Sequence, residues 1–183
     1  GNGEQWQTGK DGFDTALNFE GLPGESGATT EDTDAVLGLL EPESTVECWV
    51  RINSYSWKGF AFVARTAYSE GSIAWLMQIV DDGRLRYTWR SPSGWGPFLI
   101  STDSLTAGKW HHVAAVREIE PDHPDAGSGD IAVRIYIDGV LQDHGRFNDV
   151  NMPVETDDRL FVGHYGDFTK VLDGAVDELR LSS

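Results

Sequence analysis

Four residues near the two ends of the chain carry oxygen atoms that could hold a cation: Glu20, Gly21, Asp173 and Asp177. Asp177 shares a predicted strand face with Leu179 and Leu181, and a carboxylate on a core-facing position is costly unless it is paired or binds a cation. If the last strand lies beside the first, Asp177 comes near Glu20 and Gly21, and together they offer the hard oxygen ligands that Ca²⁺ takes. We therefore predict a structural Ca²⁺. The alternative is that Asp177 caps a turn or pairs with an arginine or a backbone N–H.

A stripe of arginines could recognise a negatively charged ligand. Arg84, Arg86 and Arg90 alternate along one predicted strand, so their side chains share a face. Guanidinium groups bind carboxylate and sulfate in a bidentate manner, which would suit an acidic polysaccharide. The alternative is a solvated sheet face on which these arginines pair with neighbouring Glu and Asp side chains.

Aromatic residues in or beside turn-like segments form a second candidate surface: Trp57, Tyr68, Trp95 and Tyr165. An exposed flat ring can stack on the apolar face of a sugar, and aromatic rings dominate recognition hot spots. A tryptophan within a loop can equally plug the end of a β-sandwich, so both interpretations stay open. The tryptophans that alternate with other apolar residues are predicted to lie in the core: Trp49, Trp75, Trp89 and Trp110.

No pattern for bond-making chemistry accompanies these residues. His111 and His112 are adjacent on a predicted strand, so their rings point to opposite faces and cannot chelate one ion together. Asp177 and Glu178 are likewise neighbours on opposite faces, whereas a retaining glycosidase needs two carboxylates about 5–5.5 Å apart. The sequence has no nucleophile elbow, phosphate loop or zinc-type Cys/His spacing. We therefore predict a protein that is not an enzyme.

The chain has 183 residues and is strongly acidic, with a formal net charge of -16. Such a surface repels nucleic acid and anionic lipid and favours cations or a neutral ligand. No apolar run approaches the roughly 20 residues of a membrane-spanning helix. The single cysteine, Cys48, lies among apolar neighbours, which predicts a buried free thiol. Because no initiator Met or signal segment precedes the domain, we interpret the chain as a mature or excised module of a larger protein.

Short β-rich runs bounded by turn residues recur along the chain, while helix-period segments are scarce. About a dozen strands without a helix predict an all-β fold, in which one domain over 1–183 forms two antiparallel sheets packed face to face. The predicted strands are 15–21, 35–40, 44–53, 60–65, 73–80, 84–90, 98–101, 110–119, 131–137, 140–144, 159–164 and 175–181.

The turns of two predicted hairpins can be assigned from their residues. In the first, a three-residue loop with Gly83 in the left-handed conformation pairs Trp75 with Trp89 and keeps apolar side chains on one face. A two-residue loop would mix apolar and charged residues on both faces, so the pattern favours the longer loop. The second hairpin is closed by Asp138 and Gly139, a two-residue type I′ signal.

Six segments occur in sequence order and together cover most of the chain: "ALNFEG", "STVECWVR", "GKWHHVAAVR", "VRIYIDGVL", "RLFVGHYG" and "LDGAVDELRL". They resemble the laminin-G-like jelly roll of the concanavalin A-like lectin/glucanase superfamily. The resemblance implies two curved antiparallel sheets with the first and last strands adjacent, and commonly one Ca²⁺ near an edge. Glucanases of this superfamily typically show Glu-x-Asp-x-x-Glu, and this sequence lacks that run.

The resemblance also implies a function, because such modules are often appended to secreted or surface glycan-processing enzymes and adhesins. We expect a non-catalytic carbohydrate-binding module that binds a polysaccharide, carries a structural calcium and belongs to a larger secreted or cell-surface protein. The alternatives are a protein-interaction module that packs against a neighbouring domain and a divergent lyase or hydrolase. Nucleic acid and membrane insertion are not expected.

Overall fold

The computed structural model describes residues 5–10, 15–21, 28–29, 43–55, 60–66, 73–80, 82–91, 94–120, 131–147, 159–164 and 171–182. The regular structure in these segments is all β-strand: β1 (Gln5–Gln7), β2 (Ala16–Glu20), β3 (Ala28–Thr29), β4 (Ser44–Ile52), β5 (Phe60–Thr66), β6 (Ile73–Ile79), β7 (Arg84–Ser91), β8 (Gly94–Ser104), β9 (Trp110–Ile119), β10 (Ile131–Ile137), β11 (Val140–Phe147), β12 (Arg159–Val162) and β13 (Asp173–Ser182). Within those segments, no helix has the length and apolar character needed to cross a membrane.

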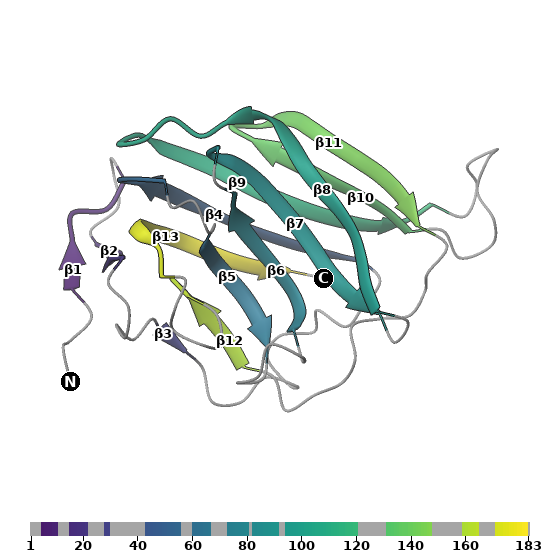
Figure 1. Ribbon diagram of the computed structural model, residues 1–183, viewed down its shortest axis with the longest axis horizontal. Helices are drawn as coiled ribbons and strands as arrows, with labels where there is room; N and C mark the ends of the chain where they lie inside the picture. The colour runs from purple at the N-terminus through teal and green to yellow at the C-terminus, as the bar shows by residue number, and fades with distance from the viewer. Residues whose placement is uncertain are drawn as a thin grey trace.

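The described strands form two sheets. Seven strands follow the order β1-β2-β13-β4-β9-β10-β11, and six follow the order β3-β12-β5-β6-β7-β8. Figure 1 shows the two sheets as overlapping layers, with β5, β6 and β7 crossing in front of β4 and β9. Every strand pair is antiparallel. The predicted antiparallel β-sandwich is therefore confirmed.

The core fills the space between the two sheets. Strand β4 alternates strictly between buried and half-buried positions, and its buried positions include Val46, Cys48 and Val50. Because side chains of a strand alternate between its two faces, this pattern turns one apolar row toward the opposite sheet. Trp75 and Trp89 of the opposite sheet are only 1% and 2% exposed, which confirms their predicted place in the core.

Both hairpins have the predicted register. Strands β6 and β7 pair Trp75 with Trp89 and Met77 with Tyr87. Gly83 has φ +83° and closes the loop between them. In the second hairpin, between β10 and β11, Asp138 and Gly139 have φ values of 50° and 77°. Two consecutive positive φ values are those of a type I′ turn, whose twist matches that of the flanking strands.

The two ends of the chain lie side by side, as the resemblance implies, because β2 pairs with β13. A β-bulge then interrupts β13. Asp177 lies opposite Trp49 and Arg180 opposite Glu47, so β13 uses three residues where β4 uses two. Glu178 has φ 46° within this bulge. The extra residue reverses the alternation, so Asp177 does not share a face with the leucines that follow it, and that prediction is wrong.

Three stretches differ from the predicted strands. Strand β1 was not predicted, and it places Trp6 at one edge of the seven-stranded sheet. Strand β8 extends well beyond 98–101 and includes Trp95, which was expected in a loop. Strand β3 lies outside the predicted strands. The predicted strand 35–40 lies outside the described residues.

Candidate functional site

The outer face of the six-stranded sheet carries the predicted arginine stripe. Cross-strand pairing aligns Leu76 with Thr88 and Phe98, and Gln78 with Arg86. Register partners share a face of the sheet, so these five side chains form one surface on the side away from the core. We call this surface, made of Leu76, Gln78, Arg86, Thr88 and Phe98, the arginine face.

Three residues of the arginine face contact one another. Arg86 Nη2 donates a hydrogen bond of 2.6 Å to Gln78 Oε1. The guanidinium carbon of Arg86 also lies 5.1 Å from the centroid of the Phe98 ring. This combination holds the long arginine side chain in one orientation and places a planar cation against an aromatic ring.

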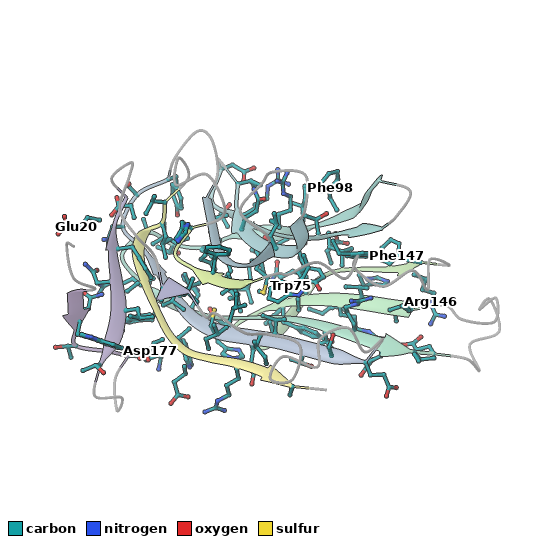
Figure 2. The ribbon with its side chains drawn as sticks, turned by 90° about the horizontal axis from the view of Figure 1, so that it is seen from below. Glu20, Trp75, Phe98, Arg146, Phe147 and Asp177 are labelled. Carbon is teal, nitrogen blue, oxygen red and sulfur yellow. The ribbon has the colours of Figure 1, made fainter. Side chains whose placement is uncertain are left out.

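Exposure is uneven across the arginine face. Leu76, Gln78 and Thr88 are 2%, 7% and 0% exposed, whereas Phe98 is 51% exposed. Figure 2 shows Phe98 on the outer side of its sheet and Trp75 between the two layers. The arginine face is therefore open to solvent at β8. Phe98 was predicted to lie in a strand but not in a site, because a single aromatic residue in a strand has no distinctive sequence pattern.

The other two arginines of the stripe lie further along β7. Arg84 Nε forms an ion pair of 2.5 Å with Asp82 Oδ2 in the preceding turn. Arg90 lies opposite Trp95 in the pairing of β7 with β8. Arg84 therefore has the acidic partner that the alternative interpretation expected. Three predicted aromatic ligand residues lie outside the described residues: Trp57, Tyr68 and Tyr165.

Strand β8 is held in place by hydrogen bonds to β11 of the other sheet. Ile100 N–H donates a hydrogen bond of 3.0 Å to Asp143 Oδ2, and Asp103 N–H donates one of 3.0 Å to Gln142 Oε1. Thr102 Oγ1 donates a third, of 2.9 Å, to the carbonyl of Gln142. These bonds satisfy backbone groups at the edge of the sheet, which would otherwise be free to pair with another chain. They also fix the strand that presents Phe98.

A second group of polar residues gathers where β2 meets β13. Glu20 lies opposite Asp173, and the neighbouring Gly21 is so close that an added Cβ would lie 2.8 Å from Asp173 Cβ. Asp173 Oδ1 accepts a hydrogen bond of 3.1 Å from Asn53 Nδ2, and Oδ2 accepts one from Ser54 Oγ. The structure thus brings three of the four predicted metal ligands together: Glu20, Gly21 and Asp173.

Asp177, the fourth predicted ligand, lies elsewhere. Its side chain accepts hydrogen bonds from the backbone N–H groups of Lys10, at 3.1 Å, and Glu178, at 2.9 Å. It follows Asp173 by four positions on β13, which at the rise of a strand is about 13 Å. Figure 2 shows Glu20 and Asp177 at the same end of the sandwich but well apart. One ion cannot therefore contact Asp173 and Asp177 together.

The cluster around Asp173 has the donor chemistry of a site for a hard cation. Carboxylate, amide and hydroxyl oxygens are the ligands that Ca²⁺ takes, usually six to eight of them. Across the described segments, no group of three or more His, Cys, Asp or Glu side chains could hold a metal ion. A Ca²⁺ here would therefore take two acidic side chains, Glu20 and Asp173, and complete its shell with neutral oxygens.

The outer face of the seven-stranded sheet carries two tryptophans that were predicted in the core. Trp49 and Trp110 are half-buried, because they occupy the positions that point away from the opposite sheet. Lys10 Nζ lies 4.0 Å from the centroid of the Trp49 ring, and the guanidinium carbon of Arg51 lies 5.3 Å from that of Trp110. The core prediction is wrong for these two residues, and each packs against a cation instead.

The two adjacent histidines are used separately. His111 Nδ1 lies 2.7 Å from Asp138 Oδ2. His112 Nε2 lies 3.4 Å from Glu47 Oε2, and its ring contacts Trp49 edge-on with the centroids 5.3 Å apart. The two rings thus contact different partners, in line with the expectation that they cannot chelate one ion together.

Comparison with known proteins relates this chain to one large superfamily. Residues 23–183 match the family described as the concanavalin A-like lectin/glucanases superfamily. No curated protein sequence matches the chain at a significant level.

Several solved structures share the fold at low sequence identity. Domain 4 of AbnA, an extracellular arabinanase of Geobacillus stearothermophilus solved with arabinotriose, has a TM-score of 0.63 at 21% identity, covering 99% of this chain and 75% of that one. The CBM40 of a Ruminococcus gnavus IT-sialidase has a TM-score of 0.64 at 13% identity, covering 90% of both chains. A SAP-like pentraxin of Limulus polyphemus has a TM-score of 0.59 at 14% identity, covering 90% of this chain and 73% of that one. At these low identities, the TM-scores show a shared fold.

Proposed function

Because the chain belongs to the concanavalin A-like lectin/glucanases superfamily, we propose that it is a non-catalytic carbohydrate-binding module whose arginine face holds a polysaccharide. The structural neighbours support this proposal. The arabinanase domain was solved with arabinotriose, and the sialidase CBM40 was also solved with α2,3-sialyllactose. Both are jelly-roll domains whose ligands are glycans.

The observation that carries the proposal is the contact of Arg86 with an aromatic ring that is itself open to solvent. Phe98 is 51% exposed, and Arg86 lies 5.1 Å from its centroid while hydrogen-bonded to Gln78. An exposed ring can pack against the C–H face of a sugar. The guanidinium and amide groups beside it can then hydrogen-bond to hydroxyl or carboxylate oxygens.

The experiment that tests this function is a glycan array followed by calorimetry on the glycans that bind. Replacing Phe98 with Ala is expected to weaken binding about tenfold or more, because aromatic anchors dominate such sites. The matched control is Val140→Ala, which removes another exposed apolar side chain, 60% exposed, from the other sheet. No binding to any glycan, or equal binding by the two variants, would refute the role of the arginine face.

We further propose that the module carries a structural Ca²⁺ at the cluster formed by Glu20, Gly21 and Asp173. The support is the placement of Glu20 opposite Asp173, together with Asn53 and Ser54, whose side chains donate hydrogen bonds to Asp173. A bound cation would neutralise two carboxylates and join β2, β13 and the end of β4. In this proposal the parent protein is secreted or displayed on the cell surface, where polysaccharides are met.

A further inference from the structure

The open part of the arginine face is small, because β6 is buried on both of its sides. Leu76 and Gln78, which point away from the core, are 2% and 7% exposed. Trp75 and Met77, which point into the core, are 1% and 0% exposed. A ligand cannot contact side chains with so little exposed surface. The arginine face is therefore covered over β6.

The covered region continues toward β12 along the same row. Register pairing extends this row from Leu76 to Ala64 of β5 and Phe161 of β12, and Phe161 is 1% exposed. In the other direction, Thr88 of β7 is 0% exposed, whereas Phe98 of β8 is 51% exposed. The row thus changes from covered to open between β7 and β8, at the end of the six-stranded sheet.

The open part is also short along the strands. Strand β7 pairs regularly with β8 in one block, where Thr88 lies opposite Phe98 and Arg86 opposite Ile100. Register shifts interrupt the pairing on both sides of this block. A bulge bends its strand and redirects the side chains that follow. The regular block therefore spans two residues of each strand, which is roughly 7 Å.

Beyond Ile100, side chains of the two strands are bonded to other partners. Thr102 Oγ1 donates a hydrogen bond of 2.9 Å to the carbonyl of Gln142 on β11. Arg84 Nε forms its ion pair of 2.5 Å with Asp82. The open block thus does not continue as a long track of unoccupied polar groups along β7 and β8.

The size and chemistry of this block fit one sugar ring. The exposed Phe98 ring can pack against the C–H face of one sugar. Arg86 lies 5.1 Å from the Phe98 centroid, where it can donate hydrogen bonds to hydroxyl groups at the edge of that sugar. A second sugar on the β6 side would meet a surface that is already covered. A sugar within a chain has neighbours on two sides, whereas a terminal sugar has a neighbour on one side.

We propose that the arginine face recognises the terminal sugar of a glycan chain and not a run of sugars within it. This inference rests on the proposed function, because it concerns the ligand of the same site. The terminal sugar lies on Phe98 and Arg86 with its free side toward the covered β6, and the rest of the chain extends into solvent. The affinity of such a site does not grow with chain length.

The test is a glycan array, followed by calorimetry, that carries oligosaccharides of arabinan, galactan and alginate from the monosaccharide to the hexasaccharide. Within a series that binds, affinities are expected to agree within about twofold from the disaccharide upward, because further sugars make no contact with the protein. Affinity that increases steadily up to the hexasaccharide would overturn the inference but leave the proposed function in place. No binding to any of these glycans would end both.

The number of protein molecules bound per chain distinguishes an end from an internal site. A linear polysaccharide of the series that binds is partly cleaved with mild acid, and equal masses of intact and cleaved polymer are titrated with the protein. Binding capacity is expected to rise in proportion to the number of chain ends. Unchanged or reduced capacity would overturn the inference, because it would mean that sugars within the chain are bound.

Two arginines on β7 provide matched variants. Arg86→Ala is expected to weaken oligosaccharide binding about tenfold or more, since it removes a charged donor beside the Phe98 ring. Arg84→Ala, about 7 Å along the same strand, removes an arginine that is paired with Asp82. It is expected to change binding about twofold or less. A similar loss in both variants would show that the contact extends along β7 and would overturn the single-sugar footprint.

Discussion

Asp173 lies directly opposite Glu20 in the pairing of β13 with β2, and it accepts a hydrogen bond of 3.1 Å from Asn53 at the end of β4. Strand β13 lies between β2 and β4 in the sheet, so this one carboxylate stands where all three strands meet. Two acidic side chains in register repel each other unless a cation or a hydrogen-bond donor compensates. Their placement makes metal dependence the first property to test.

We expect EDTA to lower the melting temperature and added Ca²⁺ to restore it. A ligand at 100 times its Kd stabilises the folded state by about 2.7 kcal/mol, which corresponds to roughly 5–10 °C for a domain of this size. Differential scanning calorimetry with and without Ca²⁺ measures the shift.

Two variants locate the ion. Asp173→Asn is expected to abolish the Ca²⁺-dependent increase in melting temperature. Asp177→Asn is expected to lower the melting temperature but keep the increase, since Asp177 is about 13 Å along the strand. The calcium proposal fails if the wild type, freed of metal, melts at the same temperature with and without Ca²⁺.

The orientation of Arg86 predicts that its planar guanidinium group contributes more to glycan binding than its charge does. Arg86→Lys keeps the positive charge but loses the fork that contacts Gln78 and lies against the Phe98 ring. We expect about tenfold weaker glycan binding, equivalent to about 1.4 kcal/mol, measured by calorimetry on a glycan that the wild type binds. Arg84→Lys is the control, because Arg84 pairs with Asp82 in the turn. Equal losses in both variants would indicate a general charge effect.

The sequence predicted those parts of the fold in which alternation and turn chemistry agree. Gly83 and the apolar pattern of its two strands allowed one register, and the structure has that register. The same alternation placed Glu47 and Trp49 on one side of their strand, away from Cys48. The core prediction for Trp49 was wrong because it relied on the apolar character of tryptophan rather than on this alternation.

The candidate site was less predictable because it depends on irregular backbone. Glu178 adopts φ 46°, a conformation that its residue type does not favour, and the bulge there reorients Asp177. The pairing that brings Asp173 rather than Asp177 opposite Glu20 is a non-local register, and a periodic pattern within one strand contains no information about it. Phe98 became a candidate only when its exposure was known.

Burial predicts that the Cys48 thiol is unreactive in the folded protein. Cys48 is 1% exposed, and desolvation together with the charge of Glu47 raises its pKa well above the usual range. We expect a thiol reagent such as DTNB to label less than a tenth of the protein at pH 8 and all of it in guanidinium chloride, because only the thiolate reacts. A raised pKa favours the protonated folded state, so its stabilising effect is present below the unfolded pKa and is lost as pH rises above it. Rapid labelling of the folded protein would contradict this burial.

Gly163 is expected to be among the glycines least tolerant of substitution. Its φ is +86°, and an added Cβ would lie 2.3 Å from the Phe19 ring of the opposite sheet. Gly163→Ala therefore combines backbone strain with overpacking, and we expect a loss of about 3 kcal/mol in the free energy of unfolding. Gly108→Ala is the matched control, because φ is +78° there but nothing lies within 4 Å of the added Cβ; strain alone should cost about 1 kcal/mol. Urea denaturation of both variants measures the difference. Equal losses would mean that Phe19 yields to the new methyl group and that the two sheets pack less tightly at this position than the structure shows.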